Sequence, residues 1–172
     1  MSCIVWRVPR PWEYFEDGGW KYEFVRDELI ANKILYQGWG IEDLRKGELS
    51  YIAKWIRIGW GDSAAASDRF KILKPMLDIE VGDPIVIPKF SIRSSETKHG
   101  RYFTIVICTR VYDFSFPAKF SSPKNICQPD FGHFIEVDPD RIVTYDYDSN
   151  SHASVISEKF HSYRRAINRA NN

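Results

Sequence analysis

Residues 34–45 read ILYQGWGIEDLR, in which an apolar run reaches Gly38-Trp39-Gly40 and stops at the polar Asp43. A short apolar run that ends in glycine predicts a β-strand followed by a turn. A tryptophan in a hydrophobic core does not need glycine on both sides, whereas glycines beside a ligand-facing tryptophan let the backbone come close to the ligand. We therefore expect Trp39 to stand at the end of a strand and to be offered to a flat ligand.

Apolar periodicity on both sides of this stretch predicts a mixture of strands and helices. Strands are expected at 3–9, 34–39, 81–90 and 102–116, and two further short strands within 131–147. Helices are expected at 20–33, 49–58 and 154–168. A further helix is expected to begin at about Ser67, with Asp68 in its first turn. Residues 91–101 read as a hairpin loop and 116–130 as an irregular loop. Because strands outnumber helices and neighbouring strands are hairpin-linked, we predict an α+β fold with a mostly antiparallel, curved or barrel-like sheet.

The 172 residues suit a single domain spanning 1–172, long enough to bury a core without disulfides. The net charge of +1 means that only local clustering of charge can indicate a nucleic-acid or membrane surface. Three cysteines without ligand spacing argue against disulfides and structural zinc, and no apolar run reaches membrane-spanning length. We therefore expect a cytoplasmic protein with no membrane span, and the polar end at 168–172 fits the edge of an N-terminal module of a longer protein.

Catalytic signatures are absent from the sequence, which contains no phosphate loop, dinucleotide fingerprint, HExxH motif or nucleophile elbow. The segment 129–136 has Asp130 and Glu136 but lacks the following lysine of a metal-dependent nuclease, and a turn followed by a strand is the simpler interpretation. A hydrolase that uses His133 and Asp130 remains a minor alternative. We predict a binding module that is not an enzyme and has no metal or cofactor.

Aromatic residues make up 15% of the chain, and the tryptophans lie before residue 61. Four of them, Trp12, Trp20, Trp39 and Trp60, stand beside Gly or Pro at predicted ends or loops. Such residues either fill a β-rich core or stack on a nucleic-acid base, which contributes roughly 1–3 kcal/mol. The pattern favours a binding surface for planar groups.

Basic residues gather on and beside the predicted hairpin loop. They are Lys89, Arg93, Lys98 and Arg101, and Glu96 is the one acidic residue that opposes them locally. A loop of this kind either contacts phosphates or forms a solvated tip. The basic end of the predicted C-terminal helix is accounted for by the helix dipole alone.

The order of these motifs resembles the EVE branch of the PUA-like superfamily, in the versions found at the N-terminus of modification-dependent restriction systems. The resemblance rests on Gly38-Trp39-Gly40, Asp43-Leu44, Gly82-Asp83, Tyr112-Asp113-Phe114 and the strand at 133–137, and it covers roughly 4–147. It implies a small β-barrel with flanking helices that flips a modified base out of double-stranded DNA and holds it in an aromatic pocket. A nuclease or NTPase would then lie on another domain or partner. The loops at 10–20 and 91–101 are longer than is typical of the family.

The resemblance implies the following roles for the matching residues. Trp39 forms one wall of the base pocket, and Gly40 lets the backbone approach the base. Trp12 or Trp20 supplies the opposing wall, with Trp60 as a further candidate. Asp43 accepts a hydrogen bond from a base amino group or caps the helix after it. The phosphate contacts are assigned to Lys89, Arg93, Lys98 and Arg101.

Two alternatives use the same aromatic residues. One is a reader of modified single-stranded RNA, and the other is a protein–protein interaction module whose aromatic residues are binding hot spots. Salt dependence separates the protein partner from both nucleic acids, because phosphate contacts release counterions and an aromatic protein interface does not.

Overall fold

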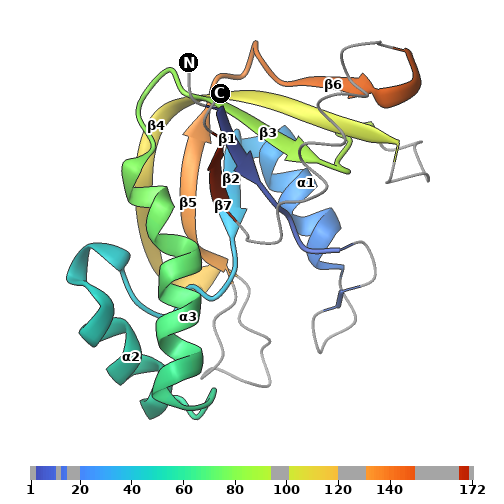
Figure 1. Ribbon diagram of the computed structural model, residues 1–172. Helices are drawn as coiled ribbons and strands as arrows, with labels where there is room; N and C mark the ends of the chain where they lie inside the picture. Colours follow the sequence, from blue (N-terminus) through green and yellow to red (C-terminus); the bar gives the residue numbers. More distant parts are fainter. Residues whose placement is uncertain are drawn as a thin grey trace.

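The computed structural model describes residues 3–10, 13–14, 20–93, 101–119, 131–149 and 167–170 (Figure 1). The strands are β1 (Cys3–Trp6), β2 (Ile34–Gln37), β3 (Pro84–Pro88), β4 (Tyr102–Lys119), β5 (Phe131–Val137), β6 (Val143–Asp146) and β7 (Ile167–Ala170). The helices are α1 (Lys21–Asn32), α2 (Glu48–Arg57) and α3 (Ser63–Leu73), with short 3₁₀ turns η1 (Leu44–Lys46), η2 (Lys74–Asp78) and η3 (Tyr147–Ser149). The predicted α+β class is therefore confirmed for the described residues.

Six strands follow one another in the order β2-β5-β4-β3-β1-β7, and β6 pairs with β4 off this path. The β1–β3 pair is parallel and the other pairs are antiparallel, so the expected mostly antiparallel sheet is present. Strands β2 and β7 stand at the two ends of the path, and no pairing between described strands joins them. The described sheet is therefore open.

Strand β4 is the longest strand of the sheet and serves two parts of it. Its first half pairs with β3 and β6, and its second half pairs with β5. The register shifts three times along the β5 pairing, first between Cys108 and Arg110, then between Arg110 and Asp113, and last between Phe114 and Lys119. Such irregularities bend a strand and increase its twist. The strand also continues to Lys119, into the region expected to be an irregular loop.

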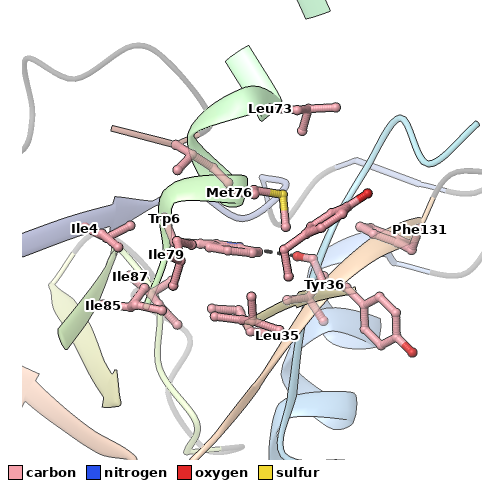
Figure 2. Packing of buried hydrophobic residues seen from close by; sticks show 14 of the residues in the cluster. Ile4, Trp6, Leu35, Tyr36, Leu73, Met76, Ile79, Ile85, Ile87 and Phe131 are labelled. Atoms are coloured by element: carbon pink, nitrogen blue, oxygen red, sulfur yellow. Dashed lines mark hydrogen bonds between the residues drawn. The ribbon is translucent and has the colours of Figure 1, made fainter. Parts of the chain in front are cut away.

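The core is centred on Trp6, which is completely buried and lies between Met76 and Leu35 (Figure 2). Its indole N–H donates to the backbone oxygen of Tyr36 at 3.3 Å. Gln37 Nε2 likewise donates to the backbone oxygen of Arg7 at 3.0 Å. These bonds tie β1 and the residue after it to β2. Since β1 and β2 are not neighbours in the sheet, the bonds also help to fix the strand from which the Trp39 turn departs.

Helix α1 lies apart from the α2–α3 pair, which stands at the lower left of the sheet in Figure 1. Helix α1 buries Tyr22, Phe24, Val25 and Leu29. Helices α2 and α3 pack on one another, with the Tyr51 ring 5.7 Å from that of Phe70. None of the described helices has both the length and the apolar character that crossing a bilayer requires.

Two predicted elements are corrected by the structure. Helix α3 begins at Ser63 rather than Ser67, because the Asp62 side chain accepts from Ala65 N at 2.8 Å and caps the alanine run. Residues 167–168, expected in a terminal helix, lie in β7, which pairs antiparallel with β1 along Cys3–Trp6. Residues 154–166 of that predicted helix lie outside the described residues.

Candidate functional site

The turn after β2 presents Trp39 in a left-handed backbone conformation, with φ of 58°. This conformation is uncommon for a residue with a side chain. The Trp39 carbonyl oxygen accepts hydrogen bonds from Ile41 N at 2.9 Å, Tyr51 Oη at 2.9 Å and His133 Nε2 at 3.1 Å. Because these donors come from the turn, from α2 and from β5, the strained backbone is held from three sides. These bonds fix the backbone from which the indole projects.

Gly40 packs against the backbone of Gly132 in β5. A Cβ atom on Gly40 would lie 2.1 Å from Gly132 N and 2.4 Å from Gly132 Cα. The absence of a side chain thus lets the turn sit directly on β5. This packing is a sufficient reason for glycine at position 40. The close approach of the backbone to a base, which the sequence suggested, is not needed to explain it.

His133 connects the turn to β4. It is completely buried, and its Nδ1 lies 3.0 Å from Tyr112 Oη, which itself accepts from Leu44 N at 3.0 Å. Because the Trp39 carbonyl oxygen can only accept, a neutral His133 carries its proton on Nε2 and donates it there, which leaves Nδ1 to accept from the Tyr112 hydroxyl. Burial lowers the pKa of His133 to about 4, although the bond to Trp39 and the charge of Asp43 act to raise it.

This arrangement weighs against the hydrolase alternative. Both ring nitrogens of His133 are engaged, and the side chain has no exposed surface on which a substrate proton could be taken. Its postulated partner Asp130 lies outside the described residues. In the described structure, His133 instead supports the Trp39 turn.

The Trp39 indole is partly buried against the core and carries Arg69 of α3 over its ring. The Arg69 guanidinium carbon lies 4.7 Å from the ring centroid, which is a cation–π contact. Arg69 is itself half-buried. Trp39 thus packs on the core and on a cation from the helical pair.

Asp43 caps η1, as one of its two predicted roles required. Its carboxylate accepts from Arg45 N at 3.0 Å, and both of its oxygens also bind the Arg45 guanidinium. Partial burial alone would raise the pKa of Asp43, but the hydrogen bonds and charge of Arg45 bring it below its usual value. A base amino group would have to share oxygens that Arg45 already occupies.

The ion pair extends into a charge row on the surface beside the turn. The row consists of Asp43, Arg45, Asp113, Arg110 and Glu136, joined by contacts of 2.7 to 3.1 Å. Arg45 and Arg110 each bridge two carboxylates of the row. With three carboxylates and two guanidinium groups, the row is not a phosphate-binding surface.

Two other predicted pocket tryptophans, Trp20 and Trp60, make their ring contacts with residues other than Trp39. The Trp20 ring packs on Tyr14 at 4.3 Å, at the start of α1, and Trp60 meets Trp55 edge-on at 5.1 Å. No ring contact among the described residues joins Trp20 or Trp60 to Trp39. Trp12 lies outside the described residues, so its predicted role as the opposing wall remains a prediction.

The predicted phosphate contacts are partly neutralised. Arg101 binds Asp146 at 2.7 Å and also approaches Asp148 at 3.5 Å. Arg93 and Lys89 are exposed, and the charge of Arg93 acts on Asp146. Lys98 lies outside the described residues. The sequence suggested Glu96 as the one opposing acid, whereas β6 and η3 bring two more carboxylates from a distant part of the chain.

Two residues of the site, Arg69 and Tyr51, were missed by the sequence reasoning. Tyr51 lies in α2 and Arg69 in α3, and no local motif marks either of them. Comparison of the chain with protein-family models, curated proteins and solved structures gave no match. The interpretation of the site therefore rests on its geometry.

Proposed function

We propose that the chain is a DNA-binding module that recognises a modified base, which it flips out of the duplex and stacks on Trp39. The observation that carries this proposal is a partly exposed tryptophan on a backbone that is held in place, because its carbonyl oxygen receives donors from Ile41, Tyr51 and His133. The part of the ring that the core and Arg69 leave exposed is the surface on which a planar base would stack.

The energies are compatible with this role. Extruding a base from a duplex costs a few kcal/mol, and stacking one base on an aromatic ring returns roughly 1–3 kcal/mol. Because the Trp39 backbone is already ordered, little of the stacking energy is lost to fixing the platform. A methyl group on the base adds roughly 0.8 kcal/mol of apolar burial, so strong discrimination requires a pocket shaped against the wrong base.

Two features of the fold also support this proposal. The bonds that Trp6 and Gln37 make between β1 and β2 bring distant strands of the open sheet together, and the shifts along β4 curve it. Both features support a small PUA/EVE-like barrel. Within that proposal, the chain acts as the specificity module of a modification-dependent restriction system, and the nuclease or NTPase lies on another domain or partner.

The proposal is tested by measuring binding to matched duplexes, either unmodified or carrying 5-methylcytosine, 5-hydroxymethylcytosine or N6-methyladenine. The wild-type chain should prefer one modification. Trp39→Ala should reduce that affinity by about 5- to 150-fold, while Trp39→Phe should retain part of it. Tyr14→Ala, which removes another exposed aromatic ring, is the matched control and should bind normally.

Equal weak binding to every duplex, or no binding at all, would contradict modified-DNA recognition. A modified single-stranded RNA of the same sequence belongs in the same experiment, because tighter binding to it would favour the RNA alternative. Circular dichroism of each variant ensures that a loss of affinity does not reflect unfolding.

A further inference from the structure

Arg69 differs from the other arginines near the Trp39 turn in having no carboxylate partner. Arg45 and Arg110 each contact two carboxylates of the charge row. No ion pair between described residues includes Arg69, whose guanidinium carbon lies 4.7 Å from the centroid of the Trp39 ring. Its positive charge is therefore uncompensated within the described part of the chain.

A guanidinium group in this position is suited to binding an anion. Contact with an aromatic ring does not consume N–H donors, so the five donors of Arg69 stay available to oxygen atoms at the edge of the indole. The planar fork of arginine matches the oxygens of a phosphate, and such bonds are roughly twice as strong as neutral ones.

The surrounding charge favours an anion on the α3 side of Trp39. The basic side chains of α3 and η2 are Arg69, Lys71 and Lys74, and the acidic ones are Asp68 and Asp78. Lys71 and Lys74 are exposed on the same helix and the turn after it. The charge row beside Asp43, in contrast, has more carboxylates than guanidinium groups.

We propose that Arg69 is the anion contact of the Trp39 site and binds the phosphate of a nucleotide whose base stacks on Trp39. This inference rests on the proposed function and specifies its ligand as a nucleotide, recognised by its ring and its phosphate together. The phosphate contact beside the base then comes from α3 rather than from the basic hairpin around Arg101.

The first test is the salt dependence of duplex binding. For the duplex that the wild type binds best, the slope of log K against log salt should fall by about 0.9 in Arg69→Gln, because one phosphate contact is lost. Affinity at low salt should fall about tenfold. Arg69→Lys, which keeps the charge, should retain most of the slope.

Arg57→Gln is the matched control, since Arg57 is an exposed arginine of α2. It should leave the slope unchanged. An unchanged slope in Arg69→Gln, or an equal reduction in Arg57→Gln, would overturn the inference. Thermal melting of each variant separates a lost contact from lost structure.

The second test does not depend on modified duplexes. The Trp39 indole N–H signal, assigned with Trp39→Phe, is followed by NMR during titration with 5-methyl-2′-deoxycytidine or its 5′-monophosphate. The wild type should bind the monophosphate more tightly than the nucleoside, and Arg69→Gln should bind the two equally.

A wild type that does not distinguish the monophosphate from the nucleoside, or binds neither, would overturn the role of Arg69. If the wild type binds the monophosphate more tightly than the nucleoside but prefers no modified duplex, the proposed function is contradicted and the anion contact is supported. The two proposals therefore fail on different observations.

Discussion

The imidazole Nε2 of His133 donates a hydrogen bond of 3.1 Å to the carbonyl oxygen of Trp39, which joins the buried face of β5 to the turn that presents the indole. The other ring nitrogen is occupied by Tyr112 of β4. One buried side chain thus links two strands to the conformation of a single surface residue. This arrangement makes the geometry of Trp39 sensitive to changes that do not touch its ring.

Replacement of His133 should weaken ligand binding through Trp39. His133→Phe fills the space but leaves one of the bonds to the Trp39 carbonyl unmade, and the loss should destabilise the fold by about 1–3 kcal/mol. His133→Gln offers an amide N–H in place of Nε2 and should recover part of the binding. Urea unfolding and duplex affinity measure the two effects. A purely structural role would lower stability in both variants without changing the affinity of the folded protein.

Stability should fall as the pH is lowered towards 4, and His133 should be the main cause. Its pKa is about 4 in the folded protein and near 6.5 when exposed, so the unfolded chain takes up the proton first. The stabilisation is complete above pH 6.5 and is lost as the pH falls through the folded pKa, with a limit of about 3 kcal/mol.

Urea unfolding of wild type and His133→Gln between pH 7 and about pH 4.5 tests this prediction. Carboxylates with a lowered pKa, such as Asp43, take up their protons at more acidic pH. In the upper part of this pH range, a change in stability therefore reports on the titration of His133. The wild type should lose stability over the range, and the variant should lose much less. Parallel curves for the two proteins would show that His133 is not the titrating group.

Gly40→Ala should be among the most damaging substitutions in the described part of the chain. The new Cβ would lie 2.1 Å from Gly132 N, so either the turn or β5 must move, at a cost of about 3 kcal/mol or more. Gly47→Ala is the matched control, because its Cβ meets no atom within 4 Å and carries only the backbone strain of φ 86° and ψ 171°, about 1–3 kcal/mol. Similar melting temperatures for the two variants would contradict the close packing of the turn on β5.

Arg101→Gln should change duplex affinity less than Arg69→Gln. Asp146 already binds the Arg101 guanidinium at 2.7 Å, so a phosphate would have to displace that carboxylate. We expect an affinity within about twofold of wild type and an unchanged salt slope. A slope reduced by about one would instead support the hairpin as the phosphate contact.

Much of the sheet could be predicted because its strands carry local signals. The buried runs of β2 and β3 are apolar over nearly their whole length, and each stands next to glycine or proline. The terminal strand β7 could not be recognised in this way. Ile167 belongs to a segment with helical periodicity, and its conformation depends on pairing with β1, which lies at the opposite end of the sequence.

Only the parts of the candidate site that are formed by residues close together in the sequence could be predicted. The turn at Trp39 and the cap at Asp43 follow from neighbouring residues. Arg69 reaches the indole from a helix that packs on its neighbour through Phe70 and Tyr51. The neutralisation of Arg101 likewise depends on Asp146, 45 residues later. Contacts between residues this far apart in the sequence cannot be recognised from the local sequence pattern.

The most direct test of base stacking on Trp39 is the NMR signal of its indole N–H during titration with a matched pair of duplexes, one modified and one unmodified. If the flipped base stacks on this ring, the modified duplex shifts the signal strongly while the unmodified duplex leaves it nearly unchanged. If the modified duplex binds and other signals shift while that of Trp39 does not, Trp39 is not the platform for the base.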